Sequence, residues 1–283
     1  MATLKNHNKT VIDYYDYTAP FYAAFWHRNN GSFAIHYGFW EKGTRNFKEA
    51  LLNTNKFLAK KAGIKSTDVV LDAGCGIGGS AIWLAKELHA KITGISINKK
   101  QIAEAKELAG KNGVSNSTNF YVMDYLRTTF DNNSFDVVWA LESACHSVNK
   151  AAFLKEMYRL LKKGGRFILA DGFQGRIKTA QDVQLMRDFN NGFATSLISA
   201  EKFKLYMKEA GFKKIVSLNM RKEITPTSKI MYHLGLWGYP LARGLEGFRL
   251  LSPIMTKNSL ACLEQYKAFR KGLVEYIVFY GEK

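Results

Sequence analysis

The residues with the clearest chemical potential form one glycine-rich run, VVLDAGCGIGG, over residues 69–79. Its first three residues are apolar and predict a buried parallel strand, which Asp72 ends. Several glycines follow, and residues 80–88 then show helical periodicity. A strand, a glycine turn and a helix let a bulky ligand approach backbone amides that carry partial positive charge. The GxGxG spacing differs from the dinucleotide fingerprint GxGxxG, so the run by itself indicates a nucleotide-type ligand without identifying it.

The elements that would hold this run alternate between strands and helices along the chain. We expect strands over residues 69–72, 91–96, 118–122, 135–140, 166–171, 213–219 and 273–280. We expect helices over residues 79–89, 99–111, 150–162 and 199–210. This alternation predicts an α/β fold with a doubly wound, mostly parallel seven-stranded sheet.

The N-terminal segment, residues 1–63, carries no strand pattern. It contains an aromatic-rich, partly helical stretch over 11–26 and an amphipathic helix over 47–62, which Gly63 would end. We therefore expect this segment to form a helical cap beside the sheet.

A second segment, residues 221–271, separates the last two expected strands and is rich in large apolar residues. Because long insertions in compact domains are usually functional, we expect a lid over an acceptor, with Trp237 and Tyr239 in its apolar wall. A plain structural subdomain or a dimer interface is the alternative. The cofactor-binding core would then comprise residues 64–220 and 272–283.

Composition limits the class of partner. The 283-residue chain has 41 Lys and Arg against 24 Asp and Glu, which gives a formal net charge of +17. Such a surface attracts anions, including phosphorylated substrates, acidic membranes and nucleic acid. The lysines are spread along the chain and no nucleic-acid-binding module is recognisable. We therefore expect no nucleic-acid partner. We attribute the positive charge to a proteome rich in lysine or to attraction of the protein to a membrane surface.

The cysteines and the hydropathy pattern indicate the cellular compartment in which we expect the protein. Cys75, Cys145 and Cys262 stand far apart with no CxxC pair, so we expect neither a disulfide framework nor a metal site. The first ten residues lack an apolar signal region, and no run of roughly 18 apolar residues exists. We expect a cytoplasmic protein with reduced cysteines. Peripheral attachment to a membrane surface and formation of a homodimer are left open.

The heptapeptide DAGCGIG resembles motif I of the class I, Rossmann-like methyltransferases that use S-adenosylmethionine. In that family the glycine turn passes under the methionine part of the cofactor, and the acidic residue contacts its ammonium group. The resemblance implies an enzyme that binds S-adenosyl-L-methionine through Asp72, Gly74, Cys75, Gly76 and Gly78.

Later segments resemble further cofactor contacts of the same family. Most relatives carry an acidic residue after the second strand to hold the ribose, and this chain departs from that pattern with Ser96. As in the sterol and tocopherol methyltransferase branch, Ser96, Ile97 and Gln101 would flank the ribose and adenine, unless Gln101 is a solvated helix residue. Asp124 and Tyr125 resemble the pair that accepts a hydrogen bond from the adenine amine and covers its ring.

Two segments resemble the methyl-transfer region of sterol C-methyltransferases. LESACH is similar to their E-A-T-C-H run, and strand ends line the crevice of open α/β sheets. The resemblance implies that Leu141 borders the cofactor, and that Glu142 and His146 lie beside the transferring methyl. For His146 a satisfied loop histidine is the alternative. The segment FAIHYGFW resembles one that closes over the cofactor in sterol, tocopherol and cyclopropane-forming relatives, which implies a catalytic role for Tyr37.

The function implied by these resemblances is C-methylation of an apolar isoprenoid or sterol-like alkene. In that reaction the enzyme aligns the reactants, excludes water and stabilises a cation before a proton is lost to a base. Three alternatives stay open at this point. They are O- or N-methylation of a small natural-product metabolite, C-methylation of a prenyl diphosphate, and a non-catalytic partner subunit with the same fold.

Overall fold

A seven-stranded sheet forms the centre of the computed structural model, which describes residues 2–27 and 31–283. Its strands are β1 (Val69–Ala73), β2 (Lys91–Ser96), β3 (Thr118–Val122), β4 (Phe135–Leu141), β5 (Leu161–Gln174), β6 (Lys213–Asn219) and β7 (Val274–Glu282). The spatial order is β3-β2-β1-β4-β5-β7-β6, and only β7 runs antiparallel to its two neighbours. The predicted α/β fold with a mostly parallel seven-stranded sheet is confirmed.

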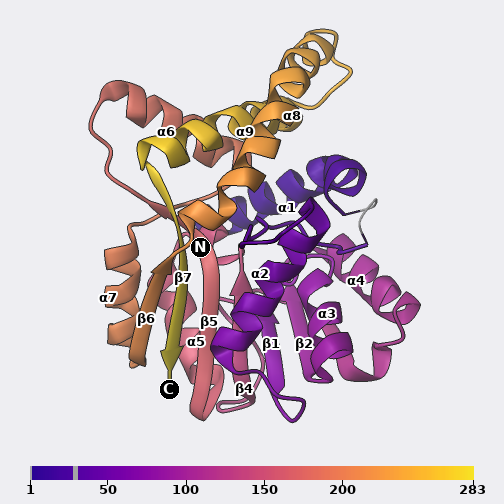
Figure 1. The fold of residues 1–283 in the computed structure, drawn as a ribbon, viewed down its shortest axis with the longest axis vertical. Coiled ribbons are helices and arrows are strands. Elements are labelled where there is room, and N and C mark those ends of the chain that lie inside the picture. The colour runs from indigo at the N-terminus through magenta and orange to yellow at the C-terminus, as the bar shows by residue number, and fades with distance from the viewer. Residues whose placement is uncertain (1, 28–30) are drawn as a thin grey trace.

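Helices cover both faces of this sheet (Figure 1). They are α1 (Ala2–Tyr22), α2 (Phe47–Ala62), α3 (Gly79–Leu88), α4 (Lys99–Lys111), α5 (Lys150–Leu160), α6 (Ala180–Phe193), α7 (Ala200–Ala210), α8 (Arg221–Gly247) and α9 (Pro253–Lys271). Apolar side chains of α2, α3 and α4 form one core with the sheet, and those of α5 and α7 form the other. Because both faces are covered, the central strands are apolar almost throughout, as the short run before Asp72 shows.

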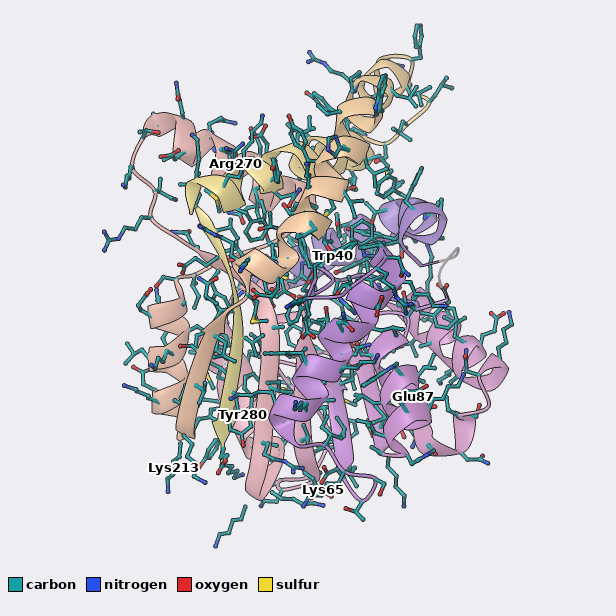
Figure 2. All side chains as sticks on the ribbon, viewed as in Figure 1. Trp40, Lys65, Glu87, Lys213, Arg270 and Tyr280 are labelled. Atoms are coloured by element: carbon teal, nitrogen blue, oxygen red, sulfur yellow. The ribbon has the colours of Figure 1, made fainter. Side chains whose placement is uncertain are left out.

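The strand order reverses between β1 and β4, which are neighbours in the sheet although β2 and β3 lie between them in sequence. Ligands of open α/β sheets bind at such a switch point, beyond the carboxyl ends of the strands. The glycine turn after β1 and the LESACH segment after β4 therefore meet at one edge. Figure 2 shows Lys65 and Lys213, which precede β1 and open β6, at the opposite end of the sheet.

A layer of helices lies over the carboxyl edge of the sheet. Side chains from α1, the π-helical turn η1 (Ala23–His27), α8 and α9 form a third apolar cluster, which includes Tyr14, Trp26, Met231 and Cys262. The segment between η1 and α2 is held under α8, where the Trp40 indole donates to Thr227 Oγ1 at 3.0 Å (Figure 2). Aromatic residues expected in a helical cap thus pack against the inserted helices. The cap expected over 1–63 also includes residues 1 and 28–30, which lie outside the described residues.

One helix of this layer, α6, was not expected from the sequence. It begins with a capping box, in which Thr179 Oγ1 accepts from the Asp182 amide and the Asp182 carboxylate accepts from the Thr179 amide. The T-x-x-D signature was present, and Leu185, Met186 and Phe189 follow it at helical spacing, so the sequence does carry the signals for this helix. The helix packs closely against α9.

The segment 221–271 does lie between two adjacent antiparallel strands, and it forms α8 and α9. The expectation that Trp237 belongs to an acceptor wall is wrong, because 84% of its surface is exposed to solvent. Tyr239 is half-buried and does not border the cavity described below. The large apolar residues of segment 221–271 did not by themselves indicate which turn of a long helix faces inward.

Gly192 allows the close approach of α6 and α9, since a Cβ there would overlap Ala261 Cβ and the Lys257 carbonyl oxygen. We expect Gly192→Ala to lower the free energy of unfolding by about 2 kcal/mol, because a packed core cannot absorb an extra methyl group. Gly238→Ala is the matched control, since its Cβ would lie 3.9 Å from Ser259 Oγ and Ala favours helix. Urea denaturation measures both variants. Equal stability for the two would show that the α6–α9 contact is loose.

Candidate active site at the carboxyl edge of the sheet

A cavity lies where β1, β2 and β4 end, and the residues predicted to bind a cofactor gather around it. The residues that border it are Asp72, Gly74, Cys75, Gly76, Ser96, Ile97, Gln101, Asp124, Tyr125 and Leu141. Gly78 does not border this cavity. Its φ of +84° and the 3.1 Å that would separate its Cβ from Ala105 and Phe120 indicate a turn that needs glycine for packing.

The glycine turn forms the floor of this first cavity. The Gly74 and Cys75 amides both donate to the Ile95 carbonyl at 2.9 Å, which anchors the turn to β2. A Cβ at Gly76 would meet nothing closer than Ile35 Cδ1 at 3.8 Å, so the space above Gly76 is open to a ligand. Gly74 is needed for a different reason, because a Cβ there would overlap Ser143 Cβ in the segment after β4.

The far side of the first cavity is built by polar contacts between distant segments. Ser96 Oγ donates to Gln101 Oε1 at 2.9 Å, and Gln101 is buried at the cavity wall, so the alternative of a solvated helix residue is wrong. Asp124 accepts from the Leu126 amide at 2.8 Å and from Asn8 Nδ2 at 2.9 Å. A carboxylate has four lone-pair sites, so Asp124 can still accept from an adenine amine.

One face of α1 completes the first cavity, and the sequence reading missed it. The residues are Asn8, Val11, Ile12 and Tyr15. Their i, i+3, i+4, i+7 spacing is the signal that would have found them, since it puts all four on one side of a helix.

A second cavity adjoins the first and is lined mainly by apolar and aromatic side chains. Its walls include Tyr14, Tyr22, Trp26, Tyr37, Phe189, Phe193, Leu197, Met231, Phe269 and Tyr276. Tyr15, Ile35, His36, Glu142 and His146 border both cavities. The chain therefore offers a site lined by the predicted cofactor residues and an apolar site, and the two meet at residues that include Glu142 and His146.

Comparison with known proteins identifies the family of this site. The family profile described as a methyltransferase domain matches residues 71–169, from β1 to β5. Cycloartenol-C-24-methyltransferase 1 of Oryza sativa subsp. japonica is 30% identical over 277 residues, which is 93% of this chain and 75% of that protein. The chain belongs to the class I S-adenosylmethionine-dependent methyltransferases. It is an enzyme, and S-adenosylmethionine is its cofactor.

Solved structures support the fold assignment of this methyltransferase. The cyclopropane synthase MmaA2 of Mycobacterium tuberculosis superposes with a TM-score of 0.84 at 14% identity, covering 98% of both chains. A geranyl diphosphate methyltransferase in complex with geranyl diphosphate and sinefungin gives a TM-score of 0.77 at 18% identity, covering 98% of this chain and 99% of that one. At these identities the likeness concerns the fold, including the helices outside the core.

The surroundings of the Asp72 carboxyl show whether the first cavity suits the cofactor. Its Oδ2 atom is buried and has no hydrogen-bond partner among the described residues. Burial raises the pKa of this carboxyl to about 7, because nothing near it balances a negative charge. An ammonium group would satisfy the orphaned oxygen and restore the charged form. The residues present therefore fit S-adenosylmethionine, which supplies an electrophilic sulfonium methyl when bound.

Glu142 has an unusual backbone and two strong donors. Its φ of +48° is rare for a residue with a side chain. Oε1 accepts from the Tyr37 amide at 2.7 Å and from the Tyr276 hydroxyl at 2.6 Å. Burial nevertheless raises the pKa of Glu142 to about 8. A cation in either cavity would favour the ionised carboxylate.

Tyr37 borders only the second cavity, and its hydroxyl donates to Gln265 Oε1 of α9 at 2.9 Å. The contact that ties it to Glu142 is made by its backbone amide. The structure thus brings Tyr37 next to Glu142 but directs its side chain to the inserted helices.

Two histidines at the junction are held neutral. His146 Nδ1 lies 3.0 Å from the Ala194 carbonyl, and the Tyr15 hydroxyl lies 2.9 Å from His146 Nε2. His36 Nδ1 lies 2.9 Å from the Tyr37 carbonyl, while His36 Nε2 is buried without a partner among the described residues. Burial lowers the pKa of each to about 4. The carbonyl contacts assign the ring protons to Nδ1, so Nε2 of both is an acceptor at neutral pH.

Other candidate chemistry is absent from the part of the chain that the structure describes. Within residues 2–27 and 31–283 no group of His, Cys, Asp and Glu is arranged to hold a metal ion. Over the same residues, no helix has the length and apolar character needed to cross a bilayer.

The raised pKa of Asp72 predicts that cofactor affinity depends on pH. Below pH 7 the free protein keeps Asp72 protonated, and binding of an ammonium group must displace that proton. Affinity for S-adenosylhomocysteine should therefore rise by roughly tenfold between pH 6 and pH 8, measured by titration calorimetry. The neighbouring Cys75 thiol stays neutral throughout, because burial raises its pKa well above the usual range. Asp72→Asn should bind more weakly and lose most of this pH dependence; an unchanged slope would assign it to another group.

Proposed function

We propose that this methyltransferase transfers the methyl group to a carbon atom of an isoprenoid or sterol-like alkene. The observation that carries the proposal is the second cavity, an aromatic-lined space that opens onto the cofactor site at Glu142. Apolar walls favour a hydrocarbon acceptor because its burial removes apolar surface from water. The relative in Oryza sativa, named for methylation at C-24 of cycloartenol, supports the same substrate class.

The chemistry of alkene methylation needs a site that stabilises a cation. When the alkene's π electrons form the new bond to carbon, positive charge develops on the acceptor. The Glu142 carboxylate lies at the meeting point of the two cavities, and ring faces in the second cavity offer negative potential to a cation. The Tyr276 and Tyr37 donors fix Glu142 in place beforehand, so little reorganisation is needed as charge develops.

Loss of a proton completes the reaction on the acceptor. His36 Nε2 and His146 Nε2 are neutral acceptors at the border of both cavities. His146 Nε2 is occupied by the Tyr15 hydroxyl, which makes Tyr15 the group that faces the acceptor on that side. We assign to Glu142 the stabilisation of charge and to Tyr37 the positioning of Glu142 through its amide. His146 takes up the proton through Tyr15, whose oxygen accepts it from the acceptor while its own hydroxyl proton passes to His146 Nε2.

The segments around the site have separate roles in this proposal. Residues 64–220 and 272–283 bind the cofactor, residues 1–63 cap it, and residues 221–271 provide the outer wall of the acceptor site through Met231 and Phe269. The wall comes from the inner turns of α8 and α9.

Two alternatives differ in how well the site supports them. The second cavity's lining, as far as the structure describes it, contains no Lys or Arg, so it offers no charge partner for a prenyl diphosphate. The Tyr15–His146 pair favours O-methylation as the second candidate, because a hydroxyl acceptor needs a base at that point. Reaction with cycloartenol and cofactor labelled with carbon-13 in the methyl group distinguishes the two. NMR of the product shows a methyl on carbon if the proposal is right, and a methoxy group if it is wrong.

Glu142→Gln tests the stabilisation of charge. We expect turnover of the alkene to fall on the order of 100-fold, because a group aimed at developing charge is lost. The affinity for S-adenosylhomocysteine should change little. Tyr276→Phe is a matched control that keeps the carboxylate and removes one donor, and it should reduce turnover by a smaller factor. Near-normal turnover in Glu142→Gln would assign Glu142 a structural role.

Met231→Trp tests the location of the acceptor. Met231 borders the second cavity and not the first, so a larger side chain should exclude the acceptor while leaving the cofactor site intact. We expect kcat/KM for the alkene to fall at least about tenfold, as in other sites where bulk is added to a filled pocket. Leu205→Trp, at an exposed position of α7, is the control. Equal activity of both variants would place the acceptor elsewhere.

A further inference from the structure

The outer part of α8 and the turn that joins it to α9 carry an exposed apolar group that the acceptor site does not use. Its members, defined here as the α8–α9 tip, are Leu236, Trp237, Leu241, Phe248 and Leu250. The exposed fractions are 84% for Trp237, 79% for Phe248 and 74% for Leu250. Monomeric soluble proteins rarely leave such a group of large apolar side chains in water without a partner.

The tip has a defined geometry. Positions 237 and 241 are spaced i and i+4, which brings them to one side of α8, and Phe248 is the residue directly after the helix. Figure 1 shows the α8–α9 pair reaching beyond the rest of the molecule, with the turn between the helices at its far end. Figure 2 shows side chains extending from that end into solvent.

Basic residues accompany the apolar ones. Arg243, Arg249 and Lys257 are exposed at the tip, against a single half-buried acid, Glu246. No ion pair joins Arg243 or Arg249 to any side chain that the structure describes. The whole chain carries a formal charge of +17. Exposed Trp and Phe next to unpaired arginines match the interface of an anionic bilayer, where ring systems lie at headgroup depth and basic groups pair with phosphates.

The same helices connect the tip to the acceptor site. Met231 borders the second cavity, and Trp237 lies six residues further along α8, a rise of about 9 Å. A tip inserted in a bilayer would therefore hold the second cavity close to the membrane surface, where an apolar acceptor resides.

We propose that the α8–α9 tip docks this methyltransferase onto an anionic phospholipid membrane. Trp237, Phe248 and Leu250 enter the interfacial region, and Arg243 and Arg249 contact the phosphates. The benefit of docking rests on the proposed function, since it concerns delivery of an apolar acceptor. Docking itself needs no turnover, so the two proposals fail separately.

Sedimentation with vesicles tests the docking. The full chain should bind vesicles of equal parts phosphatidylcholine and phosphatidylserine, and bind phosphatidylcholine alone far more weakly. Added salt should weaken the binding. Neutralising both arginines, Arg243→Gln with Arg249→Gln, should reduce affinity about 25-fold, or about fivefold for each basic residue. Trp237→Asp with Phe248→Asp should abolish binding, because charged groups replace the inserted rings.

Matched variants on another face control for charge and for exposed apolar surface. Leu205 is 52% exposed on α7, and Lys155 and Lys208 are exposed on α5 and α7. Leu205→Asp and the pair Lys155→Gln with Lys208→Gln should bind vesicles like the unaltered chain. Calorimetry with S-adenosylhomocysteine shows that every variant is folded.

Tryptophan emission gives a second readout. A shift to shorter wavelength on adding anionic vesicles should disappear in Trp237→Phe, which keeps an apolar ring and should still sediment with them. The proposal is overturned if the tip variants sediment as well as the unaltered chain, or if the control variants lose binding equally. It is also overturned if the chain does not bind vesicles and instead forms a dimer that Trp237→Asp dissociates. The tip would then be an interface between two copies of the chain.

Discussion

The site depends on two carboxyl groups held away from water at the ends of neighbouring strands. Asp72 is the last residue but one of β1 and Glu142 follows β4, on either side of the point where the strand order reverses. Burial raises the pKa of both, to about 7 and about 8, so each is costly to ionise until a cation is nearby. The folded protein thus presents two positions that favour positive charge. A cationic cofactor would satisfy the first, and in the reaction we propose a cationic acceptor would satisfy the second.

The sheet and the cofactor residues were accessible from the sequence because their signals are local. Parallel buried strands appear as short apolar runs, and the glycine turn follows directly after one of them. Since parallel strands end at the same edge, the run after β1 and LESACH after β4 had to meet. What the sequence could not give was the packing of the outer helices. Asn8 and Tyr15 reach the site only because α1 lies across the strand ends, a contact over more than a hundred positions of chain.

The same limit explains the errors in the inserted segment. Trp237 and Met231 both lie on α8 and both are apolar, yet one is exposed and the other borders the acceptor cavity. The difference is set by which turn of α8 packs on α9 and the cap, and this depends on tertiary contacts such as Ser228 with Gln265. For α6 the capping box was a local signal. Its apolar residues Leu185, Met186 and Phe189 repeat at helical spacing, so this helix was within reach of the sequence and the omission is not due to tertiary contacts.

The sheet edge carries the glycine turn, and the covering helices carry part of the second cavity. This separation has an evolutionary consequence. The glycine turn is fixed by close contacts, such as the approach of Gly74 to Ser143, that leave little freedom to change. Part of the wall of the second cavity comes from α6, α8 and α9, and no residue of these three helices borders the first cavity. Substitutions in those helices can accumulate without disturbing the glycine turn. A lineage with this architecture can therefore diversify in what it methylates while inheriting the way it holds the methyl donor unchanged.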